Sequence, residues 1–417
     1  MIEKNRTVNV ATVHSNARHG WWTMTLIAAA VLMVTMGARQ SLGLFVSPLN
    51  TATGLGIVTI SFALAVGQFV WGAVQPIAGA LADRYGTGRV LAGSIVVLAI
   101  GCALTPLLTS AFGLMLTMGI LFAAGAGGAG FSVLIGATAQ HVPANKRGTA
   151  SGVINAGGSF GQFVFAPVVQ KLISVFGWAG AMYSLAVLTL AALPATRMLR
   201  RSPDATASRM ANATDGGLRR AVASAFRDRS YLLLHAGFFT CGFHIAFLVI
   251  HLPSEVGLCG LPASVASWSL ALIGLANIVG SLVAGQWVNR YRSKYILFWM
   301  YLSRTVIILI YLAAPKTAMT FYIFAIGLGV TWLATVPPTA GVVGKLFGVR
   351  YLATLFGLTL LTHQIGAFFG AYLGGIAVDS TGSYLWMWYA DALLALAAAL
   401  VNLPIREPKV ERHTAPA

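Results

Sequence analysis

One short motif occurs twice in the chain, about half its length apart. Residues 79–89 read Gly-Ala-Leu-Ala-Asp-Arg-Tyr-Gly-Thr-Gly-Arg, and residues 285–294 read Gly-Gln-Trp-Val-Asn-Arg-Tyr-Arg-Ser-Lys. Each copy follows an apolar run long enough to cross a bilayer and opens a short basic loop before another such run. A motif duplicated in this way indicates a chain built from two copies of one helical unit.

The apolar segments predict twelve transmembrane helices. Hydrophobic residues make up 57% of the 417 residues and charged residues only 9%, which excludes a soluble globular protein. Backbone polar groups in lipid must be satisfied within the chain, so runs of this length form helices. The expected spans are 21–47, 57–82, 88–108, 111–139, 147–174, 178–199, 230–252, 263–289, 294–314, 318–343, 351–378 and 384–404.

The distribution of basic residues predicts that both termini lie in the cytosol. If they do, only Lys171 and Lys316 of the 27 Lys and Arg residues fall on the opposite side, and Arg39 and Arg304 fall inside spans. This asymmetry follows the positive-inside rule and predicts an integral protein of the plasma (inner) membrane. The net charge of +17 therefore indicates orientation and contact with anionic lipids, and we expect no nucleic-acid binding.

The spans divide the chain into two six-helix bundles, residues 1–199 and 230–417, joined by a cytosolic linker at 200–229. The linker is rich in Arg and poor in large apolar residues. Its segment Leu218–Phe226 is either a short amphipathic helix on the membrane surface or, as we favour, part of a solvated basic linker. We expect an all-α integral membrane protein, a monomer, with two pseudo-symmetric bundles. This arrangement resembles the major facilitator fold, in which the halves rock about a central site.

The repeated loops are predicted to form the cytosolic gate. In the major facilitator family the Asp of the first loop acts as a latch, which implies gating roles for Asp83, Arg84 and Arg89. Asn289 and Arg290 occupy the corresponding positions of the second loop. Asn289 keeps a hydrogen-bonding group but lacks the charge that would favour a helix N-terminus. We therefore expect an asymmetric latch, in which Asp83→Asn slows transport more than Asn289→Ala.

Ionisable groups deep in a bilayer are costly and are commonly functional. Arg39 lies in the outer half of the first span, and its planar cation suits a carboxylate, although it also has the reach to snorkel to the headgroups. Arg304 and Asp391 fall in peripheral spans, where we expect them to pair with each other. His244 and His363 titrate near neutral pH and are the candidates for carrying a proton, although an isolated buried His is more often a packing residue.

Neutral residues complete the expected substrate cavity. The polar and aromatic side chains that we assign to it, beside Arg39 and His244, are Asn155, Ser159, Gln162, Trp332 and Thr335. Much of the remaining wall is apolar, which suits a small acid with a hydrocarbon tail. The spans contain no nucleophile–base–acid set, and the three cysteines have no metal-ligand spacing. We therefore predict no enzyme activity, no catalytic residue, no metal and no cofactor.

Two segments resemble the proton-linked monocarboxylate transporters. Residues Asn145–Gly161, Asn-Lys-Arg-Gly-Thr-Ala-Ser-Gly-Val-Ile-Asn-Ala-Gly-Gly-Ser-Phe-Gly, are similar to that family's helix 5 signature, and the seventh span (230–252) is also similar. The resemblance implies transport of small organic acids, commonly with a proton. The family's first span carries a Lys that meets the substrate carboxylate, six residues before a Phe. Arg39 occupies that place before Phe45.

The chain departs from this family at two places. The acidic residue that opens the family's first-span motif is absent, because residues 19–22 read His-Gly-Trp-Trp. The Asp and Arg of the family's eighth span are also missing, because residues 275–285 carry no charge. The family's proton-coupling scheme therefore does not transfer directly.

We conclude from the sequence that the chain is a secondary active transporter of small organic anions, with monocarboxylate:proton symport by alternating access as the preferred function. The alternative is a proton-coupled efflux antiporter for small apolar or cationic compounds, which the Gly-rich fifth span ending near Pro167 also fits. The antiporter is disfavoured because no acidic residue occupies a central span. A membrane receptor is disfavoured by the internal repeat with its gating loop.

Overall fold

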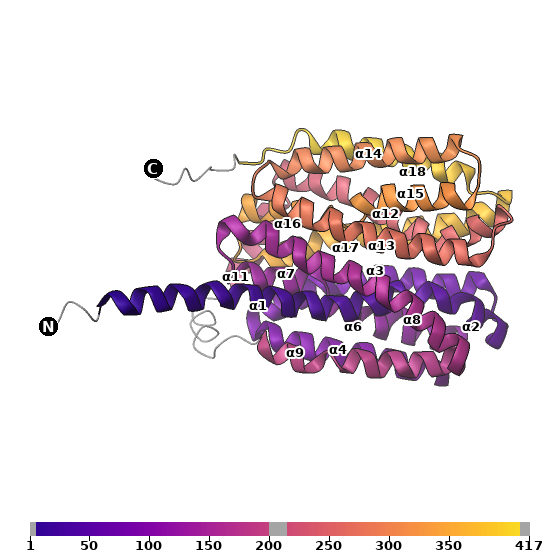
Figure 1. The fold of residues 1–417 in the computed structure, drawn as a ribbon, viewed down its shortest axis with the longest axis horizontal. Coiled ribbons are helices and arrows are strands. Elements are labelled where there is room, and N and C mark those ends of the chain that lie inside the picture. Colours follow the sequence, from indigo (N-terminus) through magenta and orange to yellow (C-terminus); the bar gives the residue numbers. More distant parts are fainter. Residues whose placement is uncertain (1–5, 200–214, 409–417) are drawn as a thin grey trace.

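The computed structural model describes residues 6–199 and 215–408, most of them in helices (Figure 1). The elements of the first half are α1 (Arg6–Gln40), η1 (Leu42–Phe45), α2 (Val46–Thr53), α3 (Ile57–Tyr85), α4 (Thr87–Leu104), η2 (Thr105–Leu107), α5 (Ala111–Leu114), the π-helix η3 (Met115–Phe122), α6 (Ala123–Gly128), α7 (Phe131–Ala139), η4 (Ala144–Lys146), α8 (Arg147–Leu190) and α9 (Leu193–Met198).

The second half follows the helix α11 (Asp215–Ala225), which lies in the linker between the halves. Its elements are α12 (Arg229–Leu258), α13 (Ala263–Val288), α14 (Ser293–Ala313), α15 (Ala318–Thr331), α16 (Val336–Phe347), α17 (Leu352–Thr381) and α18 (Leu385–Asn402). The linker segment Leu218–Phe226, which we favoured as solvated linker, is thus helical up to Ala225, as the alternative had it. The boundaries that we predicted for the two bundles stay a prediction.

The apolar helices confirm the all-α membrane fold. Eleven segments of the described chain are long and apolar enough to cross a membrane, and one of them, Ala144–Met198, has 55 residues. About 20 residues suffice for one crossing, so this segment crosses twice. The chain reverses within α8 at Gly177, whose φ of 69° lies in the left-handed region that favours glycine. The twelve predicted spans are therefore present.

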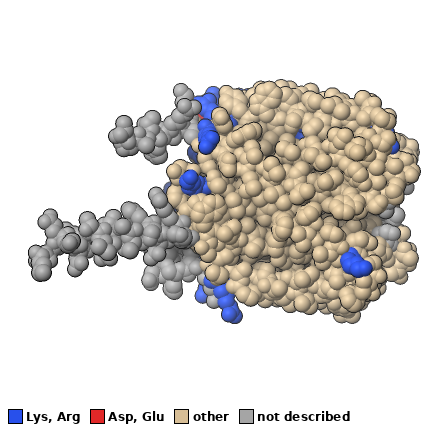
Figure 2. All heavy atoms as spheres, in the orientation of Figure 1, with Lys and Arg blue, Asp and Glu red and all other residues tan. Residues whose placement is uncertain are grey.

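The two halves lie side by side with their helices roughly parallel. Figure 1 shows the indigo-to-magenta half beside the orange-to-yellow half, with α11 and the described chain's N-terminal part at one end. We call this end, which also carries the loops at 86, 140–146, 289–292 and 348–351, the linker end. Figure 2 shows most of the visible Lys and Arg at the linker end and an almost uncharged flank. Such a band of apolar side chains suits lipid contact.

Two seams of small residues join the halves. The first runs between α8 and α13, and the second between α3 and α17. A Cβ on Gly148 would lie 2.6 Å from the carbonyl oxygen of Gly285, and one on Gly79 would lie 2.9 Å from the carbonyl carbon of Ala353. Only glycine permits such close backbone approach, which is how membrane helices pack when burial from water cannot drive their association. The halves are therefore in contact at the linker end.

The tenth span differs from the continuous helix expected over 318–343. It is divided into α15 and α16 by a turn at residues 332–335. Pro337 and Pro338 stand in the first turn of α16, where the missing N–H of proline costs least. Because proline removes helical hydrogen bonds to the preceding turn, the chain unwinds there in the middle of the bundle. The broken span becomes important for the site described below.

The closest helix contact gives a test of the packing. A Cβ on Gly242 of α12 would lie 1.6 Å from the carbonyl oxygen of His363 on α17, whereas one on Gly257 of the same helix would meet no atom within 4 Å. We predict that Gly242→Ala lowers the free energy of unfolding by about 1–3 kcal/mol, as overpacking does. Gly257→Ala should be neutral or slightly stabilising. Thermal melting of both variants in detergent checks this, and equal melting temperatures would contradict the contact.

Candidate functional site

Two adjoining cavities lie where helices of the two halves meet. Arg39 and Gln40 at the end of α1, Gln68 on α3 and Val249 on α12 line both of them. The structure thus places Arg39 at the boundary between the halves. A glycine crossing fixes this position, because a Cβ on Gly161 of α8 would lie 2.0 Å from a carbonyl oxygen of α1. Tight packing on that face of α1 leaves Arg39 to face α3 and α17.

Arg39 is held by amides and an aromatic ring. Its Nη2 donates hydrogen bonds to Oε1 of Gln68 and, at 3.4 Å, to Oε1 of Gln364 on α17. Its guanidinium carbon lies 4.3 Å from the ring centroid of Trp71, a cation–π contact. Arg39 also stands in the last turn of α1, where the helix dipole favours a cation. Residues of both halves therefore fix the cation without neutralising it.

The same cavity is lined by three side chains whose buried nitrogen atoms have no partner. These atoms are Nε2 of Gln40, Nε1 of Trp71 and Nε2 of His363. Gln364 Nε2 lies 2.7 Å from His363 Nδ1, and because an amide nitrogen only donates, Nδ1 must accept. The proton of a neutral His363 is then on Nε2, which becomes a donor. Arg39 and three neutral N–H groups thus surround one cavity.

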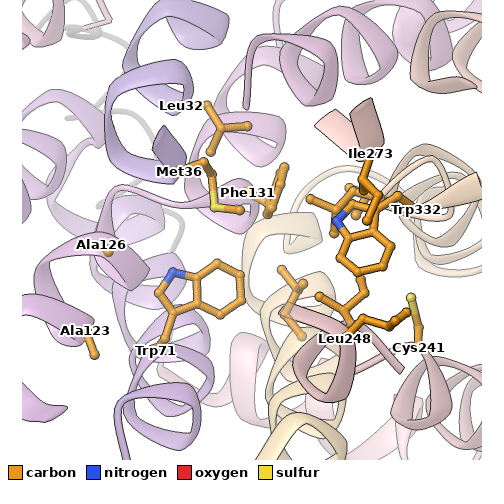
Figure 3. Packing of buried hydrophobic residues seen from close by; sticks show 14 of the residues in the cluster. Leu32, Met36, Trp71, Ala123, Ala126, Phe131, Cys241, Leu248, Ile273 and Trp332 are labelled. Carbon is orange, nitrogen blue, oxygen red and sulfur yellow. The ribbon is translucent and has the colours of Figure 1, made fainter. Parts of the chain in front are cut away.

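The cavity walls supply no negative charge. Among the described residues that line the two cavities there is no Asp or Glu. Apolar side chains make up the rest of the first cavity, chiefly Met36, Phe131, Ile245, Leu333, Val336 and Leu360. Figure 3 shows Met36, Trp71 and Phe131 grouped on one side of the core and Trp332 on the other. A small group with a negative head and an apolar body matches these walls chemically.

His244 does not line either cavity, in contrast to the expectation that it contacts substrate. Its Nδ1 lies 2.5 Å from Oδ2 of Asp391 on α18, and the two side chains are 2% and 1% exposed. The expected pairing of Asp391 with Arg304 is wrong for the same reason, since the carboxylate faces α12. The contact between His244 and Asp391 was not predictable from the sequence, because the two residues are far apart in the chain and meet only where α12 packs against α18.

Arg304 instead binds the backbone at the break in the tenth span. Its Nη2 donates to the carbonyl oxygen of Thr331 and, at 2.6 Å, to that of Trp332, while Nη1 lies 3.2 Å from Sγ of Cys241. The final carbonyls of a helix lack intrahelical donors, and a buried carbonyl without a donor is unfavourable. The buried guanidinium therefore satisfies the end of α15.

Trp332 and Thr335 lie in this break, Asn155 and Ser159 lie beside it, and none of the four lines the cavities. Asn155 Nδ2 on α8 donates to the carbonyl oxygen of Leu333 at 2.7 Å, across the boundary between the halves. Asn277 on α13 accepts from Leu333 N at 3.0 Å and donates to Ser159 Oγ at 2.5 Å. Thr335 Oγ1 lies 3.4 Å from Cys241 Sγ. These polar groups join helices and replace backbone hydrogen bonds that the turn cannot make.

The expected gating residues lie at the linker end. Asn289 Oδ1 accepts from the backbone N–H of Gly148 at 3.1 Å, and its Nδ2 donates to Thr149 Oγ1 at 2.8 Å, so it ties the end of α13 to the start of α8. The side chain of Asp83 is outside the described part of the structure. Arg84 lies over the ring of Tyr85. Arg89 and Arg290 are exposed.

Four cavity residues were missed from the sequence: Gln40, Gln68, Trp71 and Gln364. The search for intramembrane function considered ionisable groups, whereas three of these residues are neutral amides. Amides inside predicted spans are also costly to expose to lipid, so they carried a usable signal. Trp71 carried none, because a Trp in an apolar span is ordinarily a packing residue.

A sequence model of the Major Facilitator Superfamily matches residues 27–371 and 259–416. The chain is 26% identical over 400 residues to monocarboxylate transporter 13 of Rattus norvegicus, covering 92% of this chain and 89% of that protein. It is 23% identical over 417 residues to the uncharacterized MFS-type transporter YcxA of Bacillus subtilis (strain 168), covering 96% and 99%.

The fold also matches a solved structure, that of the proton:xylose symporter XylE bound to 6-bromo-6-deoxy-D-glucose. The TM-score is 0.69 at 14% identity, with 93% of this chain and 94% of that chain covered. This likeness concerns the fold alone. Because the family model spans most of the described residues, the chain belongs to the Major Facilitator Superfamily, a family of membrane transporters and not of enzymes.

Proposed function

We propose that this transporter moves a small monocarboxylate together with a proton, by alternating access between its two halves. The observation that carries the proposal is the unneutralised Arg39 in a cavity between the halves, with three partnerless nitrogens in the same walls. A carboxylate has about four lone-pair sites and accepts from a guanidinium fork in a bidentate manner. One substrate carboxylate has the acceptors that these groups lack.

The apolar walls and the charge of the cavities narrow the substrate class. The apolar part of the first cavity is formed by side chains such as Met36, Phe131 and Leu360. Such walls favour a short hydrocarbon body, because they offer few partners to additional hydroxyl or charged groups. Relatives named as monocarboxylate transporters support the same class. A cationic or apolar substrate is less compatible, because the cavities contain a cation and no described carboxylate.

The arrangement at the linker end supports a cycle in which this end is the cytosolic gate. Basic residues gather there, which by the positive-inside rule supports the proposal that both termini lie in the cytosol. Asn289 and the glycine seams hold the halves together at this end. We propose that these contacts break when the site opens to the cytosol. We assign Asp83, at the end of α3, the same role of a latch that is released when the site opens to the cytosol.

Replacing Arg39 tests the substrate assignment directly. We predict that Arg39→Gln abolishes concentrative uptake of radiolabelled lactate into proteoliposomes, because charge-assisted hydrogen bonds contribute about 1.5–3 kcal/mol each, or roughly 10- to 100-fold in affinity. Arg39→Lys should keep partial activity, since it retains the charge without the fork. Lys171→Gln, which removes an exposed cation at the other end, is the matched control. Wild-type uptake by Arg39→Gln would exclude the proposed anion site.

The His363 donor should affect affinity and not proton coupling. His363→Phe keeps a ring against Phe238, whose centroid is 4.7 Å from the imidazole centroid, but removes the Nε2 donor. We predict that KM for lactate rises about tenfold, the effect of one lost hydrogen bond of roughly 1 kcal/mol or slightly more. The dependence of uptake on pH should keep its midpoint. His141→Gln at an exposed site serves as the control, and a shifted midpoint with unchanged KM would refute this role.

The Asn289 contact predicts how the linker end opens. Asn289→Ala removes two hydrogen bonds of about 1 kcal/mol each. The equilibrium between the states closed and open at the linker end should then shift roughly tenfold or more towards the open state. Asn289→Asp keeps the acceptor for Gly148 N–H and adds a charge that the start of α8 favours. Maleimide labelling of a cysteine introduced at Ser151, whose Oγ has no partner, should accelerate only in the Ala variant. Equal labelling rates in the Asn289→Ala and Asn289→Asp proteins would argue against a latch formed by Asn289.

A further inference from the structure

The pair formed by His244 and Asp391 is not used by the proposed carboxylate site. It joins α12 to α18 within the second half, and neither side chain lines the cavities that contain Arg39. Ionisable pairs inside a membrane are costly to desolvate and are rarely retained for packing alone. The pair therefore requires a separate explanation.

The hydrogen bond fixes where a proton can be added. An ionised Asp391 only accepts, so His244 must donate from Nδ1 across the 2.5 Å contact. The lone pair of a neutral His244 is then on Nε2, which is buried and has no partner, as is Oδ1 of Asp391. This tautomer is the opposite of the one deduced for His363, whose Nε2 is a donor. His244 is arranged as a base, and His363 as a hydrogen-bond donor.

We propose that His244 and Asp391 form the proton-binding site of the transport cycle. A proton adds to Nε2 of His244, and the Asp391 carboxylate stabilises the imidazolium through the Nδ1–H bond. When the proton leaves from Nε2, the neutral imidazole and the carboxylate are restored. This inference rests on the proposed proton-coupled function and assigns its proton to a place apart from the substrate cavity.

The surrounding charges favour uptake of a single proton. Asp391 on α18 contacts His244 directly. Cys241, one turn before His244 on α12, contacts Arg304 and Tyr301 of α14, and Gly242 beside it packs on His363 of α17. Arg304 forms no described ion pair with Asp391 and is hydrogen-bonded to backbone carbonyls. With neutral His244, the Arg304 and Asp391 charges cancel, and adding one proton leaves one net positive charge. Together with one carboxylate, that proton makes a cycle without net charge movement.

A short chain of contacts connects this pair to the boundary between the halves. The ring centroid of His244 lies 5.8 Å from that of Trp332, in the turn that interrupts the tenth span. The carbonyl of Trp332 accepts from Arg304, and the next carbonyl, that of Leu333, accepts from Asn155 in the other half. A charge that appears on His244 therefore acts beside the turn whose backbone the opposite half holds. This places proton binding where it can bias separation of the halves.

Transport assays separate proton coupling from substrate binding. Proteoliposomes are tested for lactate exchange at equal pH on both sides, and for accumulation driven by a pH gradient between pH 5 and 8. We expect Asp391→Asn and His244→Gln to retain exchange within about threefold and to lose accumulation at least tenfold. Asp391→Glu should recover part of it. Glu255→Gln, which alters another buried carboxylate of the same half, should accumulate normally.

The outcomes distinguish this inference from the proposed function. Accumulation by Asp391→Asn with an unchanged pH profile would overturn the assignment, even though transport itself stands. Exchange without gradient-driven accumulation in the wild type would remove proton coupling and this site together. Both the carboxylate site and the proton site are supported if Arg39→Gln loses exchange and accumulation while the variants of His244 and Asp391 lose accumulation only.

A second measurement does not depend on transport by the variants. Protonated imidazole quenches a nearby indole, so the fluorescence of Trp332 should fall as His244 takes up a proton. We expect purified wild-type protein in detergent to show a fluorescence titration that is absent in Trp332→Phe. A titration that persists in the folded His244→Gln protein, or that is the same in Trp332→Phe, would contradict proton binding at His244.

Discussion

The need to satisfy every backbone polar group away from water governs the centre of this protein. A helix that crosses lipid satisfies its own backbone, but the tenth span is interrupted at residues 332–335 and cannot. Its free groups are bound from three other helices: Arg304 on α14, Asn155 on α8 and Asn277 on α13. The break is thus stable only while these helices stay in place. The interrupted backbone of the tenth span thus links this span to α14, α8 and α13 through hydrogen bonds.

The two intramembrane arginines illustrate how partners determine the role of a charge. Arg304 is 1% exposed, and its guanidinium is committed to carbonyl oxygens and a sulfur atom. Arg39 is half-buried and contacts neutral amides and the face of Trp71, all of which leave its charge uncompensated. Both residues are costly to bury. Arg304 gains a fixed backbone geometry in return, whereas Arg39 remains available to an anion that enters the cavity.

Sequence analysis predicted the features that depend on local composition. Hydropathy and the repeated loop identified the twelve spans, and Arg39 stood out as a planar cation inside the first span. The sequence did not identify the partner of Asp391, because residues 244 and 391 meet only through the packing of α12 on α18. The roles of the two histidines depend on which ring nitrogen is occupied, which periodicity does not reveal. The break was recognisable in principle from Pro337 and Pro338, but hydropathy smooths over such turns.

The same contacts indicate why opening and hydration accompany each other in this fold. Separation of α8 from the second half removes the Asn155 donor from Leu333 O in the tenth span and, at the linker end, the Asn289 acceptor from Gly148 N. Buried, those groups would be left unsatisfied at a cost of about 1–3 kcal/mol each. Water that follows the opening supplies the missing hydrogen bonds and removes most of this cost. The closed state is therefore held by groups that only water or the opposite half can satisfy, and partial separation without water is the least favourable arrangement.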